Sequence, residues 1–313
     1  MAIVDLAAIR AAHDRIRAHI NRTPVLTSSR IDAMHGAALF FKCENFQKVG
    51  AFKARGATNA IFALNDEVAK RGVATHSSGN HAAALARAAK LRGIAAHIVM
   101  PKNTIATKVR AVEGYGGRIV FCEPNQTSRE ETCARVIAET GATLIHPFEN
   151  PDVIAGQGTA TIELLEDEDV DLVLCPVSGG GLLCGTAIAA KSIRPQIKVI
   201  AVEPANADDA AQSFRAGKIV RVEPHTIADG LRANLGAPNF EIMQRYVDDV
   251  VTVSEEAIVE AMRAIWQIMK IIVEPSGAVP YAAIRERKID IVGRRVGVIL
   301  SGGNVDLDAL PWK

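Results

Sequence analysis

One stretch of this sequence reads Val170-Asp171-Leu172-Val173-Leu174-Cys175-Pro176-Val177-Ser178-Gly179-Gly180-Gly181-Leu182. Its first eight residues form an apolar run typical of a buried strand, and the small residues from Leu182 to Ser192 predict a following helix. A strand, a glycine loop and a helix form an anion site, because bare backbone N–H groups converge on a phosphate at the positive helix end. An ordinary tight turn is the alternative, although three successive glycines lose more backbone entropy than such a turn requires.

The phosphate bound by this loop need not belong to a dinucleotide. A dinucleotide fingerprint requires a third glycine where this chain has Cys184. Glu203, which ends the strand-like run Lys198 to Val202, stands where a ribose-binding acid could stand. A nicotinamide-dependent dehydrogenase therefore stays open as an alternative.

The heptapeptide Gly50-Ala51-Phe52-Lys53-Ala54-Arg55-Gly56 places one lysine among small residues, after the strand-like run Ala38 to Cys43. A lysine amine in an apolar, crowded site loses solvation, which favours the neutral nucleophile that reacts with a carbonyl. A solvated surface lysine is the ordinary alternative. We predict Lys53 as the catalytic residue because other loops support it.

Two further loops also follow predicted strands. Thr75-His76-Ser77-Ser78-Gly79-Asn80-His81 leads into an alanine-rich helix, and Ser301-Gly302-Gly303-Asn304 follows the run Val296 to Leu300. Hydroxyls, an amide and free N–H groups at a helix start can hold a carboxylate, although a plain helix cap would look partly similar. Small-residue loops after several strands predict a ligand crevice at the carboxyl ends of a parallel sheet.

These motifs carry a resemblance that covers nearly the whole chain. Their order resembles that of the serine racemase and serine/threonine dehydratase family, which are fold-type II pyridoxal-phosphate enzymes. The resemblance implies two parallel-sheet α/β domains of the tryptophan synthase β-like kind, with a cleft between them that closes on substrate. It places a small domain at 67–146 and a large domain at 1–66 and 147–313. The motifs are Asn45 to Lys53, Ser77 to His81, Ser178 to Gly181, Glu203 to Asp209, Thr226 to Gly230 and Ser301 to Asn304.

The resemblance also assigns cofactor contacts for pyridoxal 5'-phosphate. Lys53 is similar to the lysine that binds the cofactor covalently, Asn80 to the amide that meets the pyridine hydroxyl, and Ser301 to the hydroxyl that meets the pyridine nitrogen. A neutral hydroxyl does not keep that nitrogen protonated, so the cofactor becomes a weaker electron sink and β-elimination is favoured. The residues similar to the phosphate loop are Ser178, Gly179, Gly180, Gly181 and Leu182.

For the substrate, an amino acid, the resemblance implies carboxylate contacts from Ser77, Asn80 and His81, with Arg129 as a further contact. His81 could instead cap a helix, and Arg129 could be a solvated helix charge. Ser78 is a second predicted catalytic residue, because family racemases carry a serine there that serves the face of Cα opposite the lysine. Members with dehydratase activity alone often have alanine at that position.

Three positions depart from the racemase pattern. Ala233 stands where a serine touches the substrate carboxylate, Phe148 where an asparagine lies near the cofactor, and Ser178 where a fourth glycine is common. These departures favour a β-substituent other than that of serine, either acidic or aromatic. The ending from Gly302 to Trp312 resembles bacterial dehydratases that act on 3-hydroxyaspartate-type substrates.

A divalent cation is expected between Glu203 and Asp209, which lie six residues apart with Ala207 between them. Two carboxylates and a backbone carbonyl are suitable hard-oxygen ligands for Mg²⁺, Ca²⁺ or Mn²⁺. The resemblance places a structural cation at these three positions. The alternative is that Asp208 or Asp209 only caps the helix that runs toward Phe214.

Composition agrees with an enzyme that is neither bound to nucleic acid nor held in a membrane. The 313 residues allow roughly two domains, and 49% hydrophobic content allows a large core. Lys and Arg number 36 against 35 Asp and Glu, so a net charge of +1 gives nucleic acid or an anionic membrane no electrostatic basis. Charges interrupt the segment 3–20, which reads as an amphipathic helix. Five cysteines without a Cys-x-x-Cys pair favour reduced thiols in a cytoplasmic protein, and we expect a homodimer.

The sequence therefore predicts a pyridoxal-phosphate dehydratase that converts a β-hydroxy amino acid to a 2-oxo acid and ammonia. Serine, threonine and 3-hydroxyaspartate are the candidate substrates. Racemisation of the serine racemase type is the nearest alternative. A nicotinamide dehydrogenase and a non-catalytic amino-acid-binding regulator on the same fold also stay open.

Overall fold

The structure is a computed structural model that describes residues 4–77 and 79–312. Strands and helices alternate along most of this part of the chain, as the runs of apolar residues predict. The strands are β1 (Val25–Leu26), β2 (Ala38–Cys43), β3 (Val73–His76), β4 (Ala96–Pro101), β5 (Arg118–Cys122), β6 (Thr143–Leu144), β7 (Leu172–Pro176), β8 (Lys198–Pro204), β9 (Asp249–Val253) and β10 (Arg295–Leu300). The α-helices are α1 (Leu6–Ile16), α2 (Ser29–His35), α3 (Lys53–Ala63), α4 (Asp66–Ala69), α5 (Asn80–Arg92), α6 (Ala106–Gly114), α7 (Gln126–Thr140), α8 (Pro151–Asp167), α9 (Gly181–Ile193), α10 (Asp209–Ala216), α11 (Ala237–Tyr246), α12 (Glu255–Ala264) and α13 (Pro275–Arg285).

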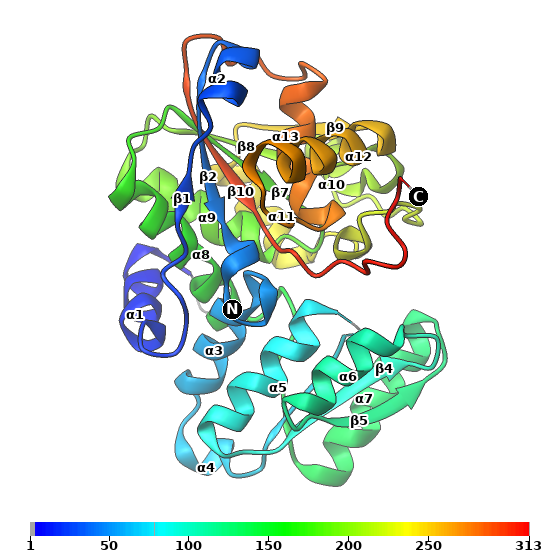
Figure 1. The fold of residues 1–313 in the computed structure, drawn as a ribbon. Helices are drawn as coiled ribbons and strands as arrows, with labels where there is room; N and C mark the ends of the chain where they lie inside the picture. Colours follow the sequence, from blue (N-terminus) through cyan, green and yellow to red (C-terminus); the bar gives the residue numbers. More distant parts are fainter. Residues whose placement is uncertain (1–3, 78, 313) are drawn as a thin grey trace.

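The strands form two sheets, which Figure 1 shows one above the other. The larger sheet has six strands in the order β1-β2-β10-β7-β8-β9, and all its pairings are parallel except that of β1 with β2. The smaller sheet has four parallel strands in the order β5-β4-β3-β6. Parallel sheets covered by helices confirm the predicted fold class.

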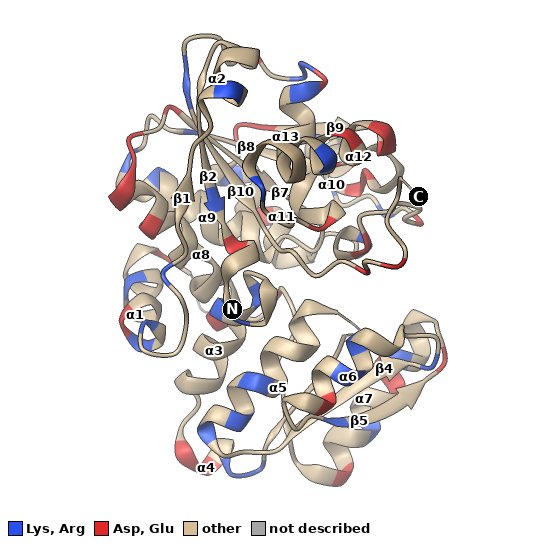
Figure 2. Ribbon diagram, viewed as in Figure 1, with Lys and Arg blue, Asp and Glu red and all other residues tan. Residues whose placement is uncertain are grey.

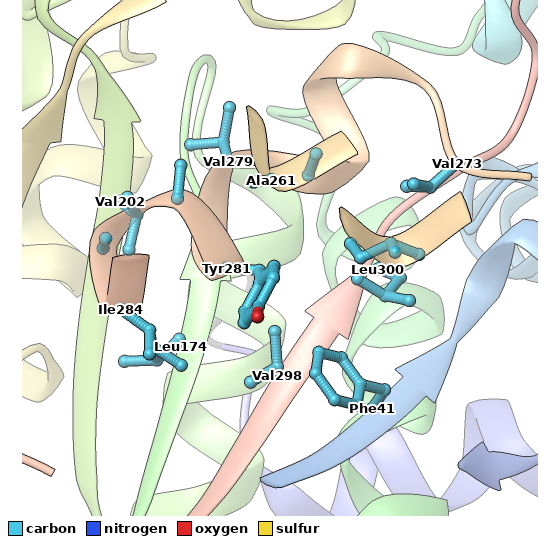
Figure 3. Packing of buried hydrophobic residues seen from close by; sticks show 14 of the residues in the cluster. Phe41, Leu174, Val202, Ala261, Val273, Val279, Tyr281, Ile284, Val298 and Leu300 are labelled. Atoms are coloured by element: carbon cyan, nitrogen blue, oxygen red, sulfur yellow. The ribbon is translucent and has the colours of Figure 1, made fainter. Parts of the chain in front are cut away.

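The six-stranded sheet is apolar on both faces, because successive residues of its strands point to opposite sides. Phe41 and Leu174 belong to the cluster under α12 and α13, whereas their neighbours Phe40 and Val173 belong to the cluster under α9 and α11. Figure 3 shows Tyr281 from α13 packed among residues of the first cluster. The sheet is therefore a rigid middle layer, and the loops at its edge have a fixed support.

The smaller sheet is held by alanine-rich α5, which lies against α3 through small side chains. Ala82, Leu85 and Ala89 of α5 join Ala57 and Ile61 of α3 in one buried cluster. The opposite face of this sheet is covered by α7, through Cys133 and Val136. The helix α3, which begins at Lys53, also packs on α8. It therefore contacts helices of both the smaller-sheet part and the larger-sheet part of the molecule.

Some structural elements differ from the expectation from sequence. The helix expected at 104–115 spans Ala106–Gly114, and several elements, including strand β9 and the helices α8, α11, α12 and α13, had no separate prediction. Figure 2 shows Lys and Arg interspersed with Asp and Glu on the visible face, as the near-zero net charge predicts. No helix in residues 4–77 and 79–312 has both the length and the apolar character needed to cross a membrane.

Candidate active site

Three neighbouring strands of the six-stranded sheet bring the predicted site loops together. β2, β10 and β7 are adjacent, and each is followed by one predicted loop, containing Lys53, Ser301 and Ser178 respectively. Ala51 pairs with Gly302 in an isolated bridge, and the Phe52 N–H donates to the Ser301 carbonyl over 3.0 Å. The backbone before Lys53 is therefore fixed directly on the loop after β10.

Lys53 stands at the start of α3, and its Nζ donates to the Pro147 carbonyl oxygen over 2.9 Å. The Phe52 ring centroid lies 5.1 Å from the same nitrogen. Desolvation lowers the pKa of the Lys53 ammonium to about 8. At neutral pH a usable fraction of this amine is uncharged, as a nucleophilic lysine requires.

The glycine loop has the geometry of an anion site. Among the described residues, no side chain caps the start of α9, and Gly180 before it has a φ of +97°. A Cβ on Gly179 would lie 2.4 Å from the Phe148 ring, and a Cβ on Gly180 would lie 2.7 Å from Asn239. Uncapped N–H groups framed by positions that exclude side chains fit the predicted phosphate of the cofactor.

Ser178 and Ala233, two of the departures from the racemase pattern, are in direct contact. The Ser178 hydroxyl donates to the Ala233 carbonyl over 2.7 Å and accepts from the Ala233 N–H over 3.0 Å. Both bonds of the Ser178 hydroxyl are therefore made to the backbone of residue 233. The predicted phosphate contact of Ser178 would come from its backbone N–H. Phe148, the third departure, covers the next residue, Gly179.

A buried carboxyl group that the sequence did not reveal links Asn80 with Asn304, in the loop that also contains Ser301. Glu274 accepts from the Asn80 side-chain amide over 2.9 Å and from the Asn304 N–H over 3.0 Å. It is 4% exposed, and burial raises its pKa to about 8. Ser301 is buried, and its hydroxyl makes no hydrogen bond within the described part of the chain. The hydroxyl is therefore available for its predicted contact with a pyridine nitrogen, which stays a prediction.

The loop after β3 holds the predicted substrate contacts. The Ser77 N–H donates to the Val99 carbonyl over 3.1 Å, and Ser78 lies outside the described residues. His81 is 2% exposed, and its Nε2–H donates to the Ile145 carbonyl over 3.3 Å. Burial lowers the His81 pKa well below its usual value, so Nδ1 is a buried acceptor without a partner. This geometry supports a structural histidine, and its contact with a carboxylate stays a prediction.

Arg129, on α7, lies at the edge of the site beside His76, which ends β3. Burial lowers the pKa of His76, the charge of Glu130 raises it, and the charge of Arg129 lowers it by a smaller amount. The Nε of Arg129 is buried without a partner among the described residues. The His146 ring lies 5.6 Å from that of His76 and 4.6 Å from that of Phe148, edge to face in both cases. A row of rings therefore connects Arg129 with the glycine loop.

Glu203 and Asp209 are both buried, at 0% and 2% exposure. Glu203 accepts from the N–H groups of Ala210 and Ala211, at 3.3 and 2.6 Å, and Asp209 accepts from the Leu235 N–H at 2.7 Å. Burial, together with the charge of Asp209, raises the pKa of Glu203 to about 9. Burial, together with the charge of Asp208, raises the pKa of Asp209 to about 6. Two desolvated carboxylates side by side fit a cation.

The helix-cap alternative takes an unexpected form, because Glu203 and not Asp208 accepts from the first turn of α10. Ala207 is buried in the short helix η3 (Ala205–Ala207) between the carboxylates. Within the described residues, no group of three or more His, Cys, Asp or Glu side chains could hold a metal. A cation here would thus depend on backbone oxygen and water for its remaining ligands.

The fold and the site together combine a half-buried lysine with a glycine loop whose geometry suits a phosphate, which is typical of one class of enzymes. The chain belongs to the family of pyridoxal-phosphate dependent enzymes, whose model matches residues 16–302. It is 51% identical over 304 residues to the beta-hydroxyaspartate dehydratase of Paracoccus denitrificans (strain Pd 1222), covering 96% of each chain. It is also 51% identical over 316 residues to the serine racemase of Oryza sativa subsp. indica, covering 99% of this chain and 93% of that one.

A solved structure agrees with these relatives. Maize serine racemase superposes with a TM-score of 0.95 at 52% identity, over 97% of this chain and 95% of the other. The family excludes a nicotinamide dehydrogenase as the reading of the glycine loop. Pyridoxal phosphate is therefore the cofactor that the site has to accommodate.

Proposed function

We propose that this protein is a pyridoxal-phosphate dehydratase that converts a β-hydroxy amino acid to a 2-oxo acid and ammonia. The observation that carries the proposal is the Lys53 amine, whose pKa is lowered to about 8 next to an uncapped glycine loop. Lys53 would hold the cofactor and take the Cα proton of the substrate. The cofactor, when bound, delocalises the electron pair that remains at Cα.

The chain's own groups would divide the remaining work. Backbone N–H groups from Ser178 to Leu182 would bind the phosphate, and Asn80 would hold the ring hydroxyl while Glu274 fixes its amide. The Ser301 hydroxyl would meet the ring nitrogen. Ser77, Asn80 and His81 would line the substrate carboxylate.

For the substrate we favour an acidic β-substituent of the 3-hydroxyaspartate type. Arg129 carries a positive charge and a free Nε beside His76, and the neutral, half-buried rings of His76 and His146 add hydrogen-bonding groups near Lys53. The relative from Paracoccus denitrificans carries the name of a beta-hydroxyaspartate dehydratase. Ala233 has no hydroxyl where the racemase pattern has a serine, and the nearby Ser178 hydroxyl is bound to the Ala233 backbone.

Racemisation through the same Cα carbanion is the second candidate, because the rice relative at equal identity is named a serine racemase. The two activities separate in one experiment. The purified protein is incubated with 3-hydroxyaspartate, serine and threonine, and 2-oxo acid, ammonia and enantiomer exchange are measured together. We expect 2-oxo acid release to dominate, fastest with 3-hydroxyaspartate. Enantiomer exchange that outpaces release on the best substrate would make the protein a racemase.

Ser78 provides the sharper variant. A racemase needs a second acid–base group on the face of Cα opposite Lys53, and elimination does not. Ser78→Ala should abolish residual racemisation and attack on the D-substrate while sparing much of the elimination from the L-substrate. Solvent deuterium incorporation at Cα measures the first effect, with Ser192→Ala, an exposed serine near the C-terminal end of α9, as the control. Equal loss of both activities would remove Ser78 from the proposed role.

We further propose that Glu203, Asp209 and the Ala207 carbonyl hold Mg²⁺, Ca²⁺ or Mn²⁺. The raised pKa values of the two buried carboxylates support this cation.

We also propose two domains, 67–146 and the rest, that close over the substrate. All four strands of the smaller sheet lie within residues 67–146, and the Asn80–Glu274 contact joins the two proposed domains across the cleft. Both observations support that division. The five free, buried cysteines support a cytoplasmic location, and light scattering would test the proposed homodimer.

A further inference from the structure

Four charged side chains are buried together behind Lys53, and the proposed reaction does not use them. They carry two positive and two negative charges, so the cluster is neutral. Each is at most 1% exposed. The cluster, which we call the charge clamp, consists of Lys42 from β2, Glu44 from the short helix η1 (Glu44–Phe46), Arg55 from α3 and Glu163 from α8.

Arg55 is the centre of the charge clamp. Its Nε and Nη2 donate to the two oxygens of Glu44 over 2.7 and 2.8 Å. Its Nη1 and Nη2 donate to the two oxygens of Glu163 over 2.8 and 2.7 Å, and Nη1 also reaches the Thr159 hydroxyl at 3.1 Å. Four of its five N–H donors make the two forked contacts and the fifth reaches Thr159, an arrangement that a lysine cannot reproduce.

Lys42 completes the charge balance. Its Nζ donates to Glu163 and to the Thr23 carbonyl, both over 2.7 Å. A buried ion cluster is a weak source of net stability, because desolvation offsets most of the attraction and apolar residues of similar volume often serve as well. The forked geometry therefore points to a role in holding elements in register.

The elements that the charge clamp joins are those that place Lys53. Arg55 follows Lys53 by two residues in the first turn of α3, and α8, which carries Glu163, begins just after Pro147. Pro147 provides the carbonyl that accepts from the Lys53 Nζ. α3 and α8 also touch at their backbones, since a Cβ on Gly156 would lie 2.6 Å from the Gly56 Cα.

We propose that Arg55 is a positioning residue that clamps the first turn of α3 to β2 and α8, and so holds the Lys53 amine against the Pro147 carbonyl. This inference rests on the proposed role of Lys53 and is independent of the substrate. The groups that face Lys53 are the Phe52 ring, His81 on α5 and His146 after β6, and the two histidines are neutral at working pH. None of these groups belongs to the charge clamp.

A loosened charge clamp has a predictable effect on the Lys53 amine. Water that reaches Nζ raises its pKa from about 8 toward the usual value of 10.5. Only the neutral Lys53 amine reacts with the aldehyde of pyridoxal phosphate. If the pKa of this amine is raised, a higher pH is needed before the lysine-linked form accumulates. A role in stability alone would lower the melting temperature and leave this pH dependence unchanged.

The test titrates full-length protein with pyridoxal phosphate between about pH 6.5 and 9.5. The lysine-linked form is measured by its visible absorption and, after borohydride, by the mass of the Lys53 peptide. Arg55→Lys should shift the half-maximal pH upward by about one pH unit. Met262→Ala is the matched control, because Met262 is buried on α12 on the opposite face of the six-stranded sheet. It should lower the melting temperature without moving the half-maximal pH.

The contrary result is an Arg55→Lys protein that is less stable but keeps the half-maximal pH of the wild type and of Met262→Ala. If Arg55→Lys does not fold, Thr159→Val decides, because it removes one acceptor of Arg55 and leaves all four charges. We expect a smaller upward shift for it, and an unchanged value would overturn the proposal. Failure of the proposed function looks different, since the wild-type adduct would then lie on another lysine.

Discussion

At the residue scale, neighbouring side chains leave no space for a side chain on Gly179 or Gly180 in the glycine loop. The Phe148 ring fills the space where a side chain on Gly179 would stand, and Asn239 does the same at Gly180. The Asn239 side-chain amide donates to the carbonyls of Gly179 and Phe148 at 2.6 and 2.9 Å. The carbonyls are thereby turned away from the predicted phosphate, and the N–H groups remain for it.

Gly179→Ala tests this crowding. The added methyl meets ring carbons of Phe148 at 2.4–2.5 Å, so we expect a loss of about 1–3 kcal/mol of stability and weaker binding of pyridoxal phosphate. Adding Phe148→Ala should recover part of both. Gly114→Ala is the control, because open space surrounds its Cβ position. Thermal unfolding and a cofactor titration measure the effects, and a Gly179→Ala protein as tight-binding as the control would contradict the account.

At the scale of elements, the connection between β8 and α10 is built around two carboxylates. Glu203 ends β8 and accepts from the first turn of α10, while Asp209 begins α10 and reaches the backbone at Leu235. In the cation-free protein the Glu203 pKa is raised to about 9 from 4.5. The unfolded chain then binds fewer protons than the folded one, so stability falls as pH rises from 4.5 to about 9.

A bound cation reverses that trend, because it replaces the protons at the two carboxylates. We expect chelator to lower the melting temperature more at pH 8 than at pH 6, and Mg²⁺, Ca²⁺ or Mn²⁺ to restore it. Asp209→Ala should lose the response, whereas Asp208→Ala, whose carboxylate bonds only Gln212, should keep it. If neither chelator nor cation changes the wild-type melting temperature at pH 8, the proposed cation site is wrong and the two carboxyl groups have a structural role alone.

Local signals explain why some elements were predictable and others were not. The strand β7 and the helix α9 are visible in the sequence, because an eight-residue apolar run and three glycines act through neighbouring residues. The loop that carries Lys53 was visible for the same reason, and its catalytic role stays a prediction. Glu274 and the charge clamp were not predicted, because their partners lie from 11 to 194 residues away. Only the fold brings such groups together.

At the scale of the molecule, a few side chains bridge the parts built on the two sheets. Lys108 of α6 forms an ion pair with Asp229 in the short helix η4 (Asp229–Leu231), and Asn80 of α5 reaches both Glu274 and Asn304. Within the described residues the four strands of the smaller sheet pair with each other, and the helix α3 also joins the two parts by packing on α5 and on α8. These bridges are the contacts that an opening motion would break first.

Lys108→Ala and Asp229→Ala test the bridge. The pair is partly exposed, so we expect a loss of about 0.2–1 kcal/mol, which corresponds to a rise in KM of up to about fivefold with kcat nearly unchanged. The exchanged pair Lys108→Asp with Asp229→Lys should recover part of the loss. Added salt should shrink the effect. A kcat loss larger than the KM change would instead place these residues in the chemical step.

The central claim is that Lys53 carries the cofactor in a desolvated site between the two sheets. The most direct measurement treats the coloured protein with borohydride, digests it and locates the added mass by mass spectrometry. The account predicts the adduct on Lys53 alone, and a Lys53→Ala protein that is colourless and inactive but folded, with a melting temperature close to that of the wild type. An adduct on any other lysine, or a Lys53→Ala protein that keeps its visible band, would contradict it.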